Sequence, residues 1–280
     1  MIVYLIQAHK DVNQLNKLIS LLVSKNSKIF VHLDKKWDLD LSILNKAIYV
    51  VEPRIDVTWG DWSQVEASLI SLKMIEKEVP NYNHVVFISG QDFPLYSNET
   101  IQQYLKPNTD YIHFQEISKT GWACESRFEA FHYHGHSLLL KFGYVILNKL
   151  GVKRKMPNNL KPFGGAGWWC LTQSTIRAIL NYIENNPQLI RFFKTTQCPD
   201  ELFFQTVICN SRLSSTLVNN HMRFIKFIEG KSNPEILTIN DLDSVFLAKA
   251  IFARKMDTEL SDELIKAIIQ NRQLKSDMIQ

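Results

Sequence analysis

The alternation of short apolar runs with amphipathic segments is the feature that most constrains the fold of this chain. Residues 2–6, 28–33 and 84–88 are apolar runs of strand length. Apolar residues recur at helical spacing in 15–23 and 65–75, which predicts helices between these strands. An order of strand, helix and strand predicts an α/β fold, with a mostly parallel sheet flanked by helices.

Polar side chains directly follow the predicted strands. His9, Asp34 and Asp92 each stand just beyond an apolar run. Because ligands of such sheets bind beyond the carboxyl ends of the strands, these positions predict a binding site. No G-x-G-x-x-G or Walker A pattern follows any strand, which disfavours a nicotinamide dehydrogenase and a P-loop NTPase.

Composition limits the partners and the location. The 280 residues are 45% hydrophobic and carry a formal net charge of +4, which indicates a folded domain and is too small to favour nucleic acid. No apolar run is long enough for a transmembrane segment. The four cysteines lack framework spacing, and the first residues lack signal-peptide features. We therefore expect a cytoplasmic protein, with peripheral contact to the inner face of a membrane left open.

The segment Pro199-Asp200-Glu201 is the sharpest catalytic candidate. Pro199 favours the first position of a helix, and acidic side chains in a first turn stabilise its free N–H groups. Capping alone would explain both acids. Helical geometry would also let Glu201 point into a cleft as a general base, while Asp200 holds the turn.

Two further groups of residues are typical of sugar and phosphate recognition. Three glycines precede Trp168 and Trp169, so that backbone and indoles could approach a ligand closely, although a core strand explains Trp169 equally well. Arg223 and Lys255 could converge on a diphosphate.

The pattern for a metal site is weak. Metal-dependent sugar-nucleotide enzymes often place an Asp-x-Asp pair after a buried strand, where this chain has only Asp92. The Asp-x-Asp matches at 38/40 and 241/243 follow no strand-like run. His132, His134 and His136 have no nearby acidic or cysteine partner, so a polar loop is favoured over a zinc site. We expect no metal and no other cofactor.

Taken together, the motifs resemble the core-2/I-branching glycosyltransferase family, in its compact, bacterial-type form. The motifs occur in the family's order over roughly residues 1–257: Tyr4-Leu-Ile-Gln-Ala-His-Lys10, Ile29-Phe-Val-His-Leu-Asp34, Val57-Thr-Trp-Gly-Asp-Trp-Ser63, Ser89-Gly-Gln-Asp-Phe-Pro94, Gly165-Ala-Gly-Trp-Trp169 and Pro199-Asp-Glu201. The resemblance implies a GT-A-type fold, a UDP-sugar donor, a saccharide acceptor, and inversion without an obligatory metal.

The resemblance also implies roles for single residues. Glu201 corresponds to the catalytic base. The donor would be bound by Asp34 at the uridine, by Trp59, and by Arg223 and Lys255 at the diphosphate, and we add Asp92 to this group. The acceptor site would involve Trp168 and Trp169, and we add Arg127. The donor sugar is expected to be N-acetylglucosamine, with xylose on the same scaffold as the alternative. A non-catalytic carbohydrate-binding protein, which needs neither a base nor a diphosphate clamp, is the second alternative.

The expected organisation is a single catalytic domain over 1–257 and a helical tail over 258–280 packed on it. The tail's Leu264, Ile265 and Ile268 are more typical of a helix packed on its own domain than of a membrane or subunit contact. The excursion 117–162 matches the family least, so the acceptor, the linkage and the oligomeric state stay open.

Overall fold

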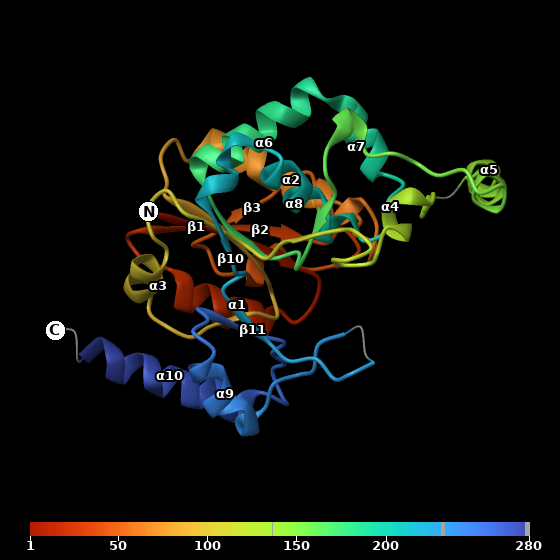
Figure 1. Cartoon of the computed structure of the whole chain (residues 1–280). Helices are drawn as coiled ribbons and strands as arrows, with labels where there is room; N and C mark the ends of the chain where they lie inside the picture. The colour runs from red at the N-terminus through yellow and green to blue at the C-terminus, as the bar shows by residue number, and fades with distance from the viewer. Residues whose placement is uncertain (136, 231–232, 278–280) are drawn as a thin grey trace.

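A central sheet between two layers of helices forms the body of the protein (Figure 1). The computed structural model describes residues 1–135, 137–230 and 233–277. Within these residues seven strands lie in the order β10-β6-β9-β4-β1-β2-β3. Only β9 runs antiparallel to its neighbours, β4 and β6. The predicted α/β fold, with a mostly parallel sheet flanked by helices, is therefore confirmed.

Of the twelve strands in the described residues, β1, β2 and β4 lie close to the three predicted apolar runs. The bounds of all twelve are β1 Ile2–Ala8, β2 Ser27–Leu33, β3 Tyr49–Val50, β4 His84–Ser89, β5 Phe93–Pro94, β6 Asp110–Ile112, β7 Gln115–Glu116, β8 Phe163–Gly164, β9 Trp169–Thr172, β10 Leu217–Asn219, β11 Arg223–Ile225 and β12 Phe252–Arg254. β1 pairs in parallel with β2 and β4, so the carboxyl ends of these three strands meet at one edge. Both faces of these strands are buried, which explains why they read as continuous apolar runs.

Helices cover both faces of the sheet. Their bounds are α1 Val12–Leu22, α2 Ser63–Glu78, α3 Asn98–Tyr104, α4 Ser126–Glu129, α5 Leu138–Lys149, α6 Gln173–Asn185, α7 Pro187–Phe193, α8 Phe203–Cys209, α9 Leu242–Leu247 and α10 Asp262–Asp277. One core lies under α1 and α10, and the other under α2, α6 and α8. Asp11 and Ser97 cap α1 and α3 by accepting hydrogen bonds from Gln14 N and Thr100 N, as their positions suggest.

The C-terminal part contains a further strand before its last helix. Phe252–Arg254 is a strand, β12, which pairs with β11 in parallel and with β5 in an antiparallel arrangement. This small sheet carries Arg254 to the edge where β4 ends. Leu264, Ile265 and Ile268 of α10 are buried in the core beside α1. No helix in the described part of the chain is both long and apolar enough to cross a membrane.

Candidate active site

Two adjoining pockets form one cleft at the carboxyl ends of β1, β2 and β4. The larger, of about 500 Å³, contains Asp200 and Glu201 and is called the carboxylate pocket. The smaller, of about 310 Å³, contains Asp34 and is called the strand-end pocket. They are continuous because four side chains line both: Trp59, Gln64, Trp168 and Arg254. The site is therefore located where the strand order predicted it.

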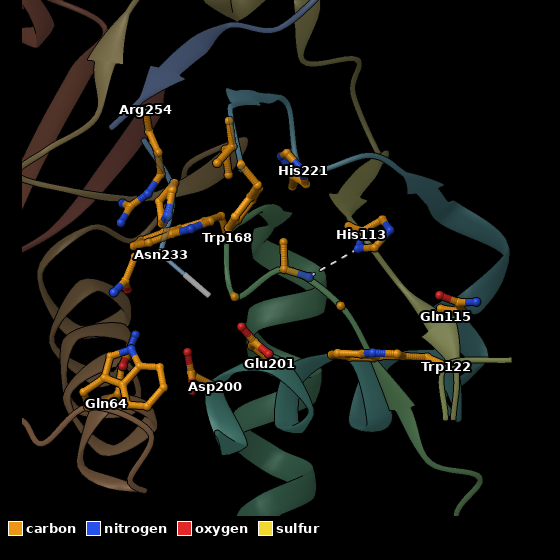
Figure 2. A pocket seen from close by; sticks show the side chains of 17 residues that line it. Gln64, His113, Gln115, Trp122, Trp168, Asp200, Glu201, His221, Asn233 and Arg254 are labelled. Atoms are coloured by element: carbon orange, nitrogen blue, oxygen red, sulfur yellow. Dashed lines mark hydrogen bonds between the residues drawn. The ribbon is translucent and has the colours of Figure 1, made fainter. Parts of the chain in front are cut away.

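Glu201 projects into the carboxylate pocket from a short 3₁₀ turn, Pro199–Glu201 (Figure 2). The α-helix begins only at Phe203, so the expected helix start at Pro199 was wrong by one turn. The Gly165 N–H donates to the Glu201 carbonyl at 2.8 Å, which fixes the turn against the glycine-rich segment. The Glu201 carboxylate lies 2.5 Å from the guanidinium of Arg127, Oε2 to Nη1.

Asp200 also lines the carboxylate pocket, although it was expected only to hold the turn. Figure 2 shows both carboxyl groups pointing into the same cavity. Burial and the neighbouring charge of Glu201 raise the pKa of Asp200 to about 7. The site therefore holds two acids in different environments. The adjacency of Asp200 and Glu201 in the sequence could have indicated this, because two neighbouring like charges affect each other's pKa.

The glycines before Trp168 are required by the protein's own packing. A Cβ on Gly165 would lie 2.0 Å from the His113 carbonyl oxygen, and one on Gly164 would lie 2.5 Å from the Trp122 ring. The sequence suggested that the glycine backbone approaches a ligand closely. In the structure it approaches His113 and Trp122 instead, and both of these residues line the carboxylate pocket. The glycines position the wall of the site.

The two tryptophans differ in their surroundings. Trp168 lines both pockets, and the Arg254 guanidinium lies 4.4 Å from the centre of its ring. Trp169 is fully buried, with ring centres 4.9 Å from Phe87 and 5.1 Å from Phe204. The expectation that Trp169 contacts the acceptor is wrong, because its strand neighbours enclose it in the core.

Asp92 and Arg223 lie beneath the cleft and do not line it. Both side chains have 0% exposure, and Arg223 Nε lies 3.6 Å from Asp92 Oδ1. The Arg223 guanidinium also donates to the Phe87 and His221 carbonyls. Because buried charges require partners, this network explains both residues structurally. The expectation that Asp92 and Arg223 contact the donor directly is therefore wrong.

Arg254, which the sequence analysis missed, is the arginine that reaches both pockets. Its Nη1 lies 3.1 Å from Asp92 Oδ2 and 2.6 Å from Ser89 Oγ. Asp92 thus positions Arg254 from below. A signal was available, since Arg254 immediately precedes Lys255 and ends an apolar strand-like run.

Lys255 lies near two other cations. The pKa of the Lys255 ammonium is below its usual value because the side chain is partly buried and Lys10 and Arg254 lie close to it. Lys10 and Lys255 directly follow the ends of β1 and β12, and Arg254, the third of these cations, lines the strand-end pocket. Clustered cations of this kind suit a ligand that carries several negative charges.

The remaining predicted donor residues line the strand-end pocket. Asp34 directly follows β2, and its Oδ1 accepts the Lys36 N–H at 2.8 Å. Trp59 is 72% exposed, which leaves its ring free for a ligand. Gln91 is buried in the pocket wall, and its Nε2 has no hydrogen-bond partner within the described residues. A ligand with an acceptor atom would satisfy this amide.

Two histidines, His113 and His221, line the carboxylate pocket. His113 Nδ1 accepts the Ala166 N–H at 3.3 Å. Partial burial and the nearby Arg223 lower the pKa of His221 to about 4, so its imidazole is neutral at pH 7. Over the described ranges, no group of three or more His, Cys, Asp or Glu side chains is placed to hold a metal ion. His136, part of the histidine motif, lies outside the described residues.

Comparison with known proteins identifies the family. Residues 2–250 match the family model described as "Branch: Core-2/I-Branching enzyme". The chain belongs to the core-2/I-branching enzyme family. The resemblance seen in the motifs is therefore confirmed.

Individual similar proteins carry two kinds of name. Human xylosyltransferase 2 is 28% identical over 233 residues, which cover 79% of this chain and 26% of that protein. Mouse beta-1,3-galactosyl-O-glycosyl-glycoprotein beta-1,6-N-acetylglucosaminyltransferase 4 is 27% identical over 222 residues, covering 74% of this chain and 46% of that protein. Mouse xyloside xylosyltransferase 1, a solved structure, is 9% identical with a TM-score of 0.40, covering 90% of this chain and 97% of that one. The chain spans about a quarter of the xylosyltransferase 2 sequence.

Proposed function

We propose that this chain is an inverting glycosyltransferase that moves a sugar from a UDP-sugar to a hydroxyl group of a saccharide acceptor. Membership of the core-2/I-branching enzyme family supports sugar transfer. The observation that carries the proposal is the layout of the cleft. A carboxylate, Glu201, and a guanidinium, Arg254, line the same cleft together with the indole of Trp168.

Inversion needs a single displacement, in which the acceptor oxygen attacks the anomeric carbon opposite the leaving UDP. In the proposed reaction Glu201 accepts the proton of the attacking hydroxyl. The ion pair with Arg127 holds one carboxylate oxygen, Oε2, and leaves Oε1 to face the acceptor. The acceptor would lie in the carboxylate pocket, between Trp122 and Trp168.

The leaving diphosphate would be stabilised in the strand-end pocket. Negative charge grows on it as the sugar departs, and fixed cations stabilise that charge. Arg254, Lys255 and Lys10 lie beside this pocket, and the carboxylate of Asp92 already orients Arg254. We propose that these cations suffice without a divalent metal. Asp34 and Trp59 would contact the uridine and the donor.

The donor sugar is proposed to be N-acetylglucosamine, in keeping with the name of the mouse relative. Xylose is the alternative, because the human relative is named a xylosyltransferase. A carbohydrate-binding protein without activity is not favoured, since recognition alone requires neither Glu201 nor the cations. We also propose that the protein is located in the cytoplasm.

The direct test combines binding with product formation. Thermal unfolding is followed with UDP, UDP-N-acetylglucosamine and UDP-xylose, because a ligand that binds only the native state raises Tm with its concentration. A panel of saccharide acceptors is then incubated with each donor, and products are identified by mass spectrometry. Stabilisation by UDP together with a single-sugar mass increase supports the proposal. A protein that no uridine nucleotide stabilises, but that a saccharide does, is a binding protein.

A further inference from the structure

Helix α5, Leu138–Lys149, is an apolar helix that the rest of the protein leaves uncovered. It lies at the far edge of the molecule from the sheet (Figure 1), and none of its residues is buried. Leu139 is 87% exposed and Phe142 is 67% exposed. Large exposed apolar patches on a protein surface mark sites that contact a partner or a membrane.

Most of the exposed apolar residues of α5 share one face, and Leu140 is the exception. At 3.6 residues per turn, one stripe runs along the helix and continues to the residue after it. We call this stripe the α5 apolar face: Leu138, Leu139, Phe142, Val145, Ile146 and Leu150. All six side chains are exposed.

The opposite side of α5 anchors it to the body. The Tyr144 ring stacks on Phe131 with 5.0 Å between ring centres. The Asn148 side chain exchanges hydrogen bonds of 2.8 and 2.9 Å with the Phe131 backbone. Ser137 caps the helix by accepting from Leu140 N. These contacts hold the helix with its apolar face directed outward.

The surroundings of this face are positively charged. Residues 130–162 contain six basic residues and no aspartate or glutamate. Arg154 is engaged with backbone carbonyls, and Lys153 pairs with Glu129 at 2.6 Å. Lys141, Lys149 and Lys155 are exposed and form no ion pair within the described residues.

We infer that the α5 apolar face inserts into the surface of a membrane that contains anionic lipids, with Lys141, Lys149 and Lys155 against the headgroups. Lys141 flanks the apolar stripe, Lys149 lies within its angular range in the last turn, and Lys155 follows the helix. A long lysine side chain can bury its stem while its ammonium reaches the headgroups, so apolar side chains with such lysines are the chemistry that this interface binds. The twelve residues of α5 are about 18 Å long, too short for a hydrocarbon core of roughly 30 Å, so the helix lies in the interface and does not span it. This inference does not depend on the proposed activity.

Vesicle co-sedimentation of the full chain tests it. We expect the protein to sediment with vesicles of phosphatidylcholine and phosphatidylglycerol, to bind phosphatidylcholine alone weakly, and to dissociate as salt is added. The double variant Leu139→Glu/Phe142→Glu should lose at least about tenfold in vesicle affinity, because two charges replace the inserted side chains. The matched control is Leu247→Glu/Leu260→Glu, which alters residues that are 79% and 62% exposed elsewhere.

The lysines are tested separately, so that the inference can be tested even if Leu139→Glu/Phe142→Glu does not fold. Changing Lys141, Lys149 and Lys155 to Gln should weaken binding to anionic vesicles by about fivefold per lysine, with no loss on neutral vesicles. The control changes three exposed lysines on other surfaces, Lys25, Lys73 and Lys77, to Gln. Failure of the wild type to bind anionic vesicles, or an equal loss in the controls, overturns the inference. So does a dimer in analytical ultracentrifugation that Leu139→Glu/Phe142→Glu dissociates, because the face would then bind a second copy of the chain.

Discussion

The Arg127 guanidinium lies 2.5 Å from the Glu201 carboxylate, and it stacks over the Trp122 ring at 4.8 Å. Arg127 belongs to α4, in the excursion between β7 and β8, whereas Glu201 precedes α8. The ion pair therefore joins the excursion 117–162 to the proposed base. The other carboxylate oxygen of Glu201, Oε1, takes no part in this ion pair.

Glu201→Gln should remove transfer and leave nucleotide binding intact. The amide keeps the shape of the side chain but cannot accept the acceptor's proton, so turnover should fall by about 10² to 10⁴. Turnover is measured by UDP release and UDP binding by calorimetry. Glu259→Gln, at an exposed position, is the control. Turnover close to that of the wild type would show that Glu201 is not the base.

Arg127→Met should lower kcat about tenfold, because Glu201 then loses the contact that orients it. We expect Arg127→Lys to recover part of kcat, which a purely structural role would not predict. Arg191→Met, on the exposed side of α7, should leave kcat unchanged. If instead only the stability changes, the ion pair serves the fold alone.

The location of the site followed from the sequence, but the roles of its arginines did not. Because Asp34 and Asp92 follow strands of a parallel sheet, their convergence on one edge was predictable. Whether Arg223 or Arg254 faces the ligand depends on β11 and β12, which form a separate sheet against β5. Three-residue strands of this kind carry too little periodicity to be recognised in a sequence.

The contacts of the glycine-rich segment and the exposure of α5 could not be predicted from the sequence either. Three glycines indicate a close approach, yet only the fold reveals that His113 and Trp122 are approached. Helix α5 lies in the excursion 117–162, where no helix was predicted, and the exposure of its apolar face was not predicted either. Tertiary contacts decide both outcomes, and no local pattern contains them.

Asp92→Asn should reduce both stability and donor binding. The substitution leaves Arg223 buried without a carboxylate partner, and breaking a buried ion pair of this kind costs about 3 to 5 kcal/mol. It also frees Arg254 from the group that orients it. We expect a lower free energy of unfolding in urea and a weaker UDP affinity. Arg254→Met, by contrast, should weaken UDP binding with a smaller loss of stability. Equal stability of Asp92→Asn and the wild type would contradict this account of the network.

Removal of divalent metals should leave activity unchanged. If Arg254, Lys255 and Lys10 stabilise the diphosphate, the reaction requires no divalent metal ion, and chelation by EDTA should not lower the rate. Initial rates are compared in EDTA, in Mn²⁺ and after extensive dialysis. Loss of activity in EDTA that Mn²⁺ restores would contradict the proposed metal-independent reaction.

Asp200 should make stability fall as the pH rises from about 4 to above 7. Its pKa is raised from 3.8 to about 7 in the folded protein, so the native state holds a proton that the unfolded state has already lost over this range. Where the native state binds more protons, the free energy of unfolding decreases with increasing pH. Asp200→Asn cannot lose that proton. Relative to the wild type, the variant should therefore be more stable at pH 8 than at pH 5.

Urea unfolding of both proteins at pH 5 and pH 8 measures this effect. Because the Asp200 carboxyl borders the open cleft, we expect the difference in unfolding free energy to change by about 1 to 2 kcal/mol, less than full burial would give. The control, Asp243→Asn, alters an exposed carboxylate on α9 and should show no such change. If the gap between Asp200→Asn and the wild type is the same at both pH values, Asp200 is ionised throughout, and Glu201 has a charged neighbour at every working pH.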